Sequence, residues 1–313
     1  MSASAVMGGE STPNSPFLRE VFDRVCIGQN IDSFKSTNKF RCFRPQQHIQ
    51  YNAYCDDFGP MNFACIAKYV ELLDHELTAF PQCRVVHSVA EGRRALTNAV
   101  FLLGSYMMLK FGKTADEVSD VFNWLEESHI ESFRDATHAK AEFVLSLYDC
   151  WFGLEKGMTL GWVQMATEDE PAMWGKVDVE EYDSWDCPLN GDLHVVVPER
   201  FIAFRGPVDL RGRAYCDDSG YRRFAPCFYI EGMASLGVTD VFRLNEAEYD
   251  EEDFTKNGIR VHDLFFDDCT LPPPEVVEEF FRTVDKCKGI MAIHCKAGLG
   301  RTGTLIALDM MRR

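Results

Sequence analysis

The spacing of apolar residues along the chain alternates between two periods. Short apolar runs at 237–243, 259–261 and 290–293 have the length and the β-branched content of buried strands. Between such runs, apolar residues recur every three or four positions, which is the spacing of one face of a helix. Strands and helices that alternate in this way are typical of an α/β fold.

Two helices can be placed from the residues at their first turns. Thr114 and Glu117 form a T-x-x-E capping box ahead of an apolar stripe, which predicts a helix over 113–128. Pro274 suits a first helical position and precedes a second stripe, so a helix is also expected over 274–288.

Composition divides the chain into four parts. Residues 1–16 are small, polar and proline-containing, and we expect them to be disordered. Residues 167–192 are rich in Asp, Glu and Trp and lack a sustained apolar period, which indicates an acidic linker. This leaves two α/β domains, 17–166 and 193–313, and a chain of 313 residues with 46% hydrophobic content has room for both cores.

The charge and the cysteine count exclude several classes of protein. A net charge of −17 and a pI near 4.9 argue against nucleic acid as a partner, because a polyanion would be repelled over most of the surface. The 12 cysteines contain no C-x2-C pair and lie at no zinc-ligand spacing from the eight histidines, so we expect reduced thiols, an intracellular protein and no metal. The longest apolar run, 99–109, is too short for the ~20 residues of a membrane helix.

The segment 292–303 reads A-I-H-C-K-A-G-L-G-R-T-G and contains two overlapping motifs, G-x-G-x-x-G and C-x5-R. Both require a strand, a glycine-rich turn and a helix whose free N–H groups face an anion, and here a helix is expected over 302–313. A dinucleotide fold also requires an acidic residue about 20 positions further on, whereas ten residues follow Gly303. The C-x5-R motif is therefore the better interpretation.

A second C-x5-R match serves as a control. Cys216 and Arg222 have the same spacing, but the loop between them carries Asp217 and Asp218, whose charges would repel a phosphate and raise the pKa of the thiol. The loop that follows Cys295 contains no acid.

The chemistry of phosphate transfer explains the residue types of the second loop. Inward backbone amides, a helix N-terminus and a fixed cation can lower a thiol pKa from about 8.5, so Cys295 is predicted to be a thiolate nucleophile. Arg301 can hold two equatorial phosphoryl oxygens, and Thr302 can donate its hydroxyl to the sulfur. A buried core thiol is the alternative for Cys295. The predicted phosphate cradle comprises Lys296, Ala297, Gly298, Leu299, Gly300 and Arg301.

The stretch H-C-K-A-G-L-G-R-T-G resembles the signature of cysteine-dependent protein phosphatases, and in detail that of the mitotic-exit type of cell-division-cycle dual-specificity phosphatases. The stretches at 57–62 (D-F-G-P-M-N), 133–136 (F-R-D-A), 190–192 (N-G-D) and 262–266 (H-D-L-F-F) resemble the same family. The resemblance runs from about Tyr51 to the C-terminus. It implies two tandem phosphatase-like domains and hydrolysis of phosphoserine, phosphothreonine and phosphotyrosine through a phosphocysteine. It also implies phosphoprotein substrates of cyclin-dependent kinases in the nucleus or cytoplasm, and no cofactor.

Expulsion of the substrate oxygen requires a proton donor. Asp263, Asp267 and Asp268 cluster in the loop H-D-L-F-F-D-D. The resemblance implies Asp268 as the general acid. Asp267 is the second choice, and ordinary surface acids are the alternative for all three.

An upstream segment repeats the pattern of the signature without its chemistry. Residues 84–99 align with it over four positions, and the resemblance also implies a degenerate, non-catalytic first domain. Serine cannot become a thiolate, and Glu91 would place a negative charge in the cradle. Two unrelated α/β turns would be the alternative. The aligned pairs are His87 with His294, Ser88 with Cys295, Ala90 with Ala297, and Arg94 with Arg301.

Three acids near the linker match positions at which the resembled family holds a basic residue beyond the phosphosite. They are Asp183, Asp186 and Asp192. The resemblance implies Ser-Pro or Thr-Pro substrates with a downstream Lys or Arg. A solvated linker without a recognition role is the alternative.

Two other functions stay open. Phosphoinositide phosphatases use similar loops with a lysine where this chain has Leu299, so a highly charged headgroup is disfavoured. A non-catalytic phosphoprotein-binding module is the second, because the chain ends at Arg313 where the resembled family continues through further helices. We therefore expect an incomplete catalytic domain with an uncovered apolar face. The face would consist of Leu305, Ile306, Leu308 and Met310.

Overall fold

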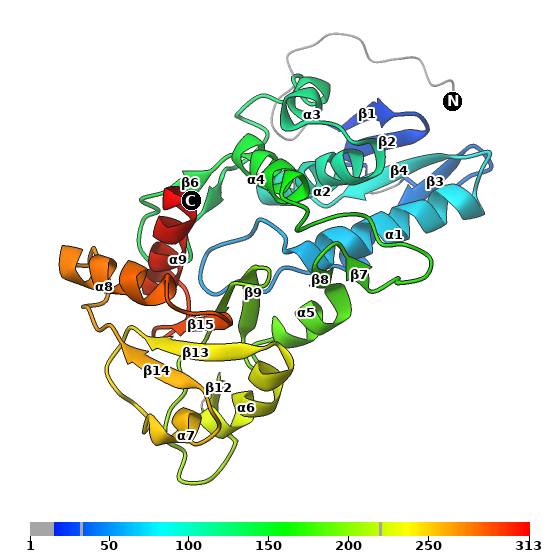
Figure 1. Ribbon diagram of the computed structural model, residues 1–313. Coiled ribbons are helices and arrows are strands. Elements are labelled where there is room, and N and C mark those ends of the chain that lie inside the picture. The colour runs from blue at the N-terminus through cyan, green and yellow to red at the C-terminus, as the bar shows by residue number, and fades with distance from the viewer. Residues whose placement is uncertain (1–15, 32–33, 219–220) are drawn as a thin grey trace. The chain divides into compact units, whose positions relative to one another are not determined.

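The computed structural model describes residues 16–31, 34–218 and 221–313 (Figure 1). The chain forms two compact units, one that ends at Val179 and one from Glu180 to Arg313. This boundary falls inside the segment expected to be a linker. The segment is structured: the hairpin of β7 (Met173–Trp174) and β8 (Val177–Asp178) belongs to the first unit, and almost all of α5 (Val179–Trp185) belongs to the second.

The first unit is built around a four-stranded sheet of order β1-β2-β4-β3. Strand β1 is antiparallel to β2, and the other pairs are parallel. The strands are β1 (Phe17–Phe22), β2 (Val25–Gln29), β3 (Phe40–Phe43) and β4 (Arg84–Val89). The helices are α1 (Phe63–Ala79), α2 (Arg93–Phe111), α3 (Ala115–Val121) and α4 (Leu147–Thr159), with a 3-10 turn at Pro45–Gln47 and a hairpin of β5 (Phe133–Arg134) and β6 (Val144–Leu145).

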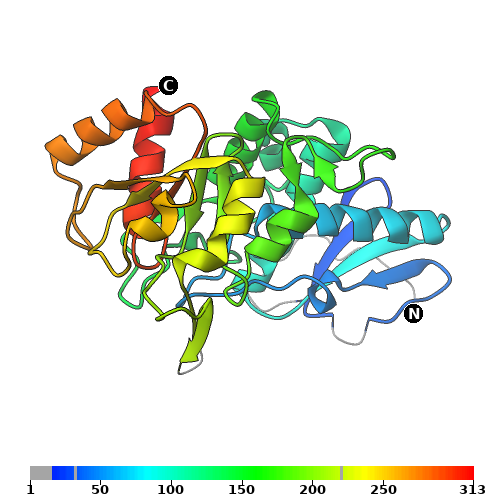
Figure 2. The same cartoon turned by 60° about the horizontal axis from the view of Figure 1, so that its bottom comes forward.

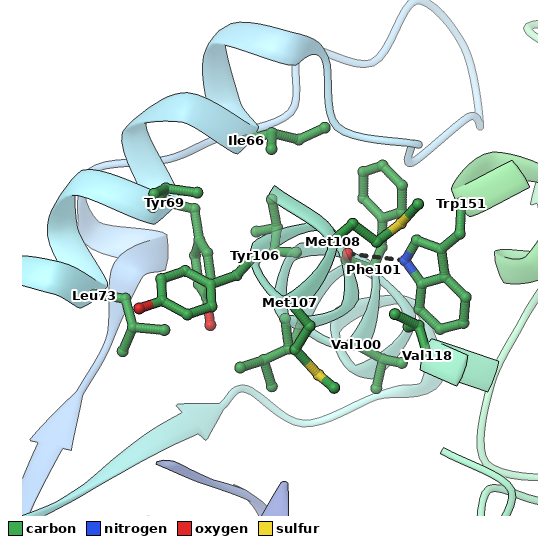
Figure 3. Packing of buried hydrophobic residues seen from close by; sticks show 14 of the residues in the cluster. Ile66, Tyr69, Leu73, Val100, Phe101, Tyr106, Met107, Met108, Val118 and Trp151 are labelled. Carbon is green, nitrogen blue, oxygen red and sulfur yellow. Dashed lines mark hydrogen bonds between the residues drawn. The ribbon is translucent and has the colours of Figure 1, made fainter. Parts of the chain in front are cut away.

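Helix α2 is the centre of the first core (Figure 3). It is apolar on almost all sides, as expected for a helix covered by a sheet and by other helices. The indole of Trp151, from α4, lies against Gly104, where a Cβ would come within 2.4 Å of the ring. The same indole donates its Nε1–H to the carbonyl oxygen of Phe101 at 3.2 Å. The glycine therefore provides the space that the tryptophan fills.

The second unit contains a five-stranded sheet of order β14-β13-β15-β10-β9, in which only β9 is antiparallel to its neighbour. Helices α8 and α9 cover one face and α6 and α7 the other (Figures 1 and 2). The strands are β9 (Leu193–Val197), β10 (Phe201–Phe204), β13 (Val238–Arg243), β14 (Arg260–Asp263) and β15 (Ile290–His294). The helices are α6 (Pro226–Ser235), α7 (Glu252–Thr255), α8 (Pro274–Val284) and α9 (Gly300–Arg312), and β11 (Tyr215–Asp218) and β12 (Tyr221–Phe224) form a separate hairpin.

Alternate side chains of β10 explain the two helical layers. Phe201 stacks on Phe280 of α8 with ring centroids 6.3 Å apart, whereas Phe204 contacts Tyr229 of α6 at 5.1 Å. Successive side chains of a strand point to opposite faces, so a strand that is apolar at every position requires cover on both.

Three expectations from the sequence are wrong. The helix expected over 274–288 is α8, which ends at Val284. The helix expected over 113–128 is α3, which ends at Val121 although its capping box forms as predicted. The chain leaves the helix because Phe122 stacks on Trp151 at 5.7 Å while Trp124 meets Phe17 at 5.5 Å.

The apolar face expected on the last helix is also smaller than predicted. Leu305 and Ile306 are 0% and 2% exposed, because α9 lies against β10 and β15. Met310, in contrast, is 45% exposed. The disorder expected for residues 1–16 falls, apart from Pro16, outside the described residues.

Candidate active site

The segment with the two overlapping motifs lies at the carboxyl end of β15, the central strand of its sheet. Cys295 follows the strand directly and is 3% exposed, and α9 begins at Gly300. The loop between them runs close to the neighbouring strand: a Cβ on Gly298, whose φ is +76°, would lie 2.5 Å from the carbonyl oxygen of Phe204. The loop leads directly into the first turn of α9, whose backbone N–H groups have no partner within the helix. Such N–H groups at a helix N-terminus can bind an anion.

The surroundings of Cys295 favour the thiolate. Burial alone would raise the pKa of the thiol, but four other effects outweigh it and hold the pKa below its ordinary value. They are hydrogen bonds from the hydroxyl and the backbone N–H of Thr302, a hydrogen bond from the backbone N–H of Gly298, and the charge of Arg301. Thr302 is itself fully buried, so its hydroxyl is withdrawn from water.

The guanidinium of Arg301 is fixed from one side. It is 5% exposed, and its Nη1 donates to the carbonyl oxygens of Phe266 at 3.0 Å and Leu244 at 3.4 Å. Its buried Nε makes no hydrogen bond to any described residue and lies 3.4 Å from an Asp268 carboxylate oxygen. A buried cationic donor without a hydrogen bond, beside a thiol of lowered pKa and a helix N-terminus, is suited to an incoming oxyanion.

The histidine of the signature is hydrogen-bonded to the backbone of the loop. His294 is fully buried, and its Nδ1 lies 3.0 Å from the carbonyl oxygen of Cys295. Because a carbonyl oxygen only accepts, Nδ1 carries the hydrogen, and Nε2 accepts from the hydroxyl of Tyr249 at 2.8 Å. Burial lowers the pKa of His294 to about 4, so the ring is neutral and positions the loop without adding charge.

The structure separates the three acids of the H-D-L-F-F-D-D loop. Asp263 is paired in bidentate fashion with Arg243, at 2.5 and 2.8 Å, and this pairing lowers its pKa. Asp267 is exposed, and its backbone oxygen accepts from the hydroxyl of Thr270. Asp268 is the one that the structure brings to Arg301.

The control motif is a different structure. Cys216 and Arg222 lie on the two paired strands of the β11–β12 hairpin, and not in a loop between a strand and a helix. The guanidinium of Arg222 is bound to Asp217 at 2.7 and 2.9 Å. The equal spacing of Cys and Arg is therefore not accompanied by an anion site.

Two family models match the chain. The model described as the N-terminal half of dual specificity protein phosphatases matches residues 21–157, and a model described as the DSP-PTPase phosphatase of a polymorphic toxin system matches residues 229–313. Dual specificity protein phosphatase CDC14C of Symphalangus syndactylus is 33% identical over 302 residues, covering 96% of this chain and 60% of that protein. CDC14B of Mus musculus is 33% identical over 295 residues, covering 94% and 58%.

The chain belongs to the CDC14 dual-specificity phosphatase family. It consists of two tandem α/β domains of the dual-specificity-phosphatase type. It spans about 60% of the length of CDC14C and CDC14B. Among the described residues, no helix has both the length and the apolar content to cross a membrane.

The first of the two CDC14-family units has the same local structure without the anion site. His87 and Ser88, both buried, lie near the end of β4, which ends at Val89, and α2 begins after the loop. His87 is held by the hydroxyl of Tyr69 at 3.0 Å, and burial lowers its pKa to about 3. Arg94 donates hydrogen bonds to carboxylates, with its Nη1 2.8 Å from an Asp56 oxygen, whereas the hydrogen bonds of Arg301 go to backbone carbonyl oxygens.

A second carboxylate completes the neutralisation of Arg94. Its Nε donates to Glu131 at 2.9 Å, and hydrogen bonds from Arg94 lower the pKa of Asp56 to about 2. The cavity of about 120 Å³ beside this loop is lined mainly by apolar side chains, among them Ile49 and Val89. Neither the arginine nor the cavity is suited to a phosphate.

The acids that the resemblance assigned to substrate binding lie in two different environments. Asp183 is exposed on α5. Asp186 lies 2.8 Å from Nδ1 of His194, and Asp192 lies 3.3 Å from Nε2 of the same ring and 3.0 Å from Arg205. Neither His194 nor Arg205 could be predicted as a partner of these acids, because no motif or spacing links them.

One group of described residues could supply three metal ligands: Asp240, His262 and Cys287 lie with their ligand atoms within 4.8 Å of one another. The carboxylate of Asp240 is already bound by Arg260, with both contacts at 2.7 Å, by His262 at 2.8 Å and by the hydroxyl of Thr239. This buried carboxylate is thus satisfied by protein donors alone.

Proposed function

We propose that this chain is a dual-specificity protein phosphatase that hydrolyses phosphoserine, phosphothreonine and phosphotyrosine through a phosphocysteine. The observation that carries the proposal is the pairing of Cys295, with its lowered pKa, and Arg301, whose buried Nε makes no hydrogen bond to any described residue. Together they form a nucleophile and an oxyanion clamp at the N-terminus of α9.

The mechanism requires two displacements at phosphorus. The Cys295 sulfur attacks in line, the S–P bond forms, the P–O ester bond breaks, and Asp268 donates its proton to the leaving oxygen. Arg301 and the amides of 296–301 hold the equatorial oxygens. Asp268 then removes a proton from water, whose oxygen attacks phosphorus while the S–P bond breaks. Thr302 stabilises the departing thiolate.

The substrates are phosphorylated proteins, and we assign their phosphosites to the Ser-Pro and Thr-Pro class with a basic residue downstream. The acids at 183, 186 and 192 are the residues assigned to this basic side chain. The exposed Asp183 supports the assignment, since a cationic side chain is attracted to an uncompensated carboxylate. Kinase sites of this class are those of cyclin-dependent kinases, so the proposed role is reversal of that phosphorylation during the cell cycle, in the nucleus or cytoplasm.

Covalent trapping tests the catalytic proposal. A phosphopeptide mixed with the chain and quenched in acid is expected to leave a phosphoryl group on Cys295, detected by mass spectrometry. Iodoacetate should alkylate the same thiol well below pH 8, and phosphate or vanadate should protect it. Turnover of para-nitrophenyl phosphate equal to that of Cys295→Ser would disprove catalysis. Phosphopeptide binding without turnover would instead favour a non-catalytic phosphoprotein-binding module.

A further inference from the structure

Two of the three acids proposed to recognise a basic residue already face a basic residue of the chain itself. His194, on β9, lies between them, with Nδ1 2.8 Å from Asp186 and Nε2 3.3 Å from Asp192. Carboxylates only accept hydrogen bonds, so two carboxylates on the two ring nitrogens require a hydrogen on each. With both acids ionised, this geometry is that of an imidazolium cation.

A second cation completes the cluster. The Nη2 of Arg205 lies 3.0 Å from the other carboxylate oxygen of Asp192. The side chains of Asp186, Asp192 and His194 are 16%, 18% and 27% exposed, so their charges interact with little screening by water. Two carboxylates and two cations sum to zero net charge. Asp183, on the same segment, is exposed.

The cluster lies beside the signature loop. Arg205 is flanked by Phe204 and Gly206, and both contact that loop. The N–H of Gly206 donates to the carbonyl oxygen of Lys296 at 3.2 Å, and a Cβ at this glycine would lie 2.2 Å from the carbonyl oxygen of Cys295. A substrate bound at the loop consequently has this cluster within a few residues of its phosphosite.

We propose that His194 is a specificity-determining residue that occupies Asp186 and Asp192 and so weakens selection for a basic substrate residue. The inference rests on the proposed function. With His194 in place, a substrate Lys or Arg must compete with an internal cation for the same oxygens, and Asp183 supplies the uncompensated charge. Without His194, the cluster has a net charge of −1 and can accept one substrate cation.

The test compares two phosphopeptides that differ only in arginine or alanine downstream of a phospho-Ser-Pro site. We expect His194→Gln to raise the arginine-to-alanine ratio of kcat/KM about fivefold, which is the range of a single partly exposed ion pair. Asp186→Asn removes a carboxylate and leaves His194, so the ratio should fall. A merely structural role would change both peptides equally and leave the ratio unchanged in both variants, which would overturn the proposal.

The unmodified chain provides a second test that does not depend on the folding of a variant. Burial would lower the pKa of His194, but the hydrogen bonds that the ring donates to Asp186 and Asp192 outweigh it and raise the pKa to about 9. The charged groups that face the ring are these two acids, with Arg205 behind Asp192. We expect the arginine-to-alanine ratio of the wild type to rise between pH 8 and 10. A ratio that stays flat would overturn the proposal.

The same measurements separate the inference from the proposed function. If neither peptide nor para-nitrophenyl phosphate is hydrolysed by the wild type, the proposed function fails. If all three are hydrolysed and the ratio responds neither to His194→Gln nor to pH, the function stands and the role of His194 fails.

Discussion

The two units present the same strand, loop and helix with opposite electrostatics. In the second unit, the arginine of the loop is held by carbonyl oxygens, keeps one donor without a hydrogen bond, and faces a thiol of lowered pKa. In the first, Arg94 is bound to Asp56 and Glu131, and a serine stands at the position of the thiol. Both keep a buried neutral histidine hydrogen-bonded to a tyrosine, at His294 and His87. The shared fold therefore preserves the shape of the loop, and the partners of the arginine decide whether an anion can bind.

Exchange of the nucleophiles is the most severe test of this comparison. Cys295→Ser should lower turnover of para-nitrophenyl phosphate by about 10⁴-fold or more, because an alkoxide is not available at neutral pH. Adding Ser88→Cys to that variant should restore nothing, since Arg94 is neutralised by two carboxylates. Activity in the double variant, measured against Cys295→Ser alone, would show that the carboxylates do not disable the first unit.

The two adjacent acids of the second unit offer a matched pair. Asp268→Asn should reduce turnover of a phosphoserine peptide by about 10²- to 10⁴-fold, because the alkoxide leaving group requires a proton. Para-nitrophenyl phosphate should be affected less, since its leaving group is stable as an anion. Asp267→Asn is the control and should stay within about twofold of the wild type. The reverse order of the two variants would make Asp267 the acid.

The residues of the signature loop can be proposed from the sequence, whereas the partners of the two arginines cannot. The glycines, Cys295 and Arg301 form one contiguous segment, so the spacing along the sequence is enough to propose them as one candidate site. The partners that distinguish the two units are distant along the chain: Asp56 and Glu131 lie 38 and 37 residues from Arg94. Pairings of that kind depend on tertiary packing, which no spacing rule encodes.

The packing of Trp151 against Gly104 in the first unit can be tested by its effect on the free energy of unfolding. Gly104→Ala would place a methyl group 2.4 Å from the Trp151 indole, a rigid neighbour, and should destabilise the first unit by about 1–3 kcal/mol. Gly153→Ala, a helical glycine with no atom within 4 Å of the added Cβ, is the matched control and should not destabilise it. Urea unfolding followed by tryptophan fluorescence measures the difference. An equal effect of both substitutions would indicate that the indole moves aside.

The smallest expected effect concerns the feature that the units share. Burial lowers the pKa of His87 to about 3 and that of His294 to about 4, below the ordinary value near 6.5. Between these values the unfolded chain binds protons that the folded chain does not, so each histidine lowers stability as the pH falls from 6.5. The slope contributed by one histidine is at most about 1.4 kcal/mol per pH unit.

His87→Gln should reduce the loss of stability of the first unit below pH 6.5 and leave that of the second unit unchanged. Hydrogen exchange of the backbone amides in β4 and β15 follows the two units separately. If His87→Gln reduced the acid loss of stability in both units, the two units would unfold as one cooperative structure.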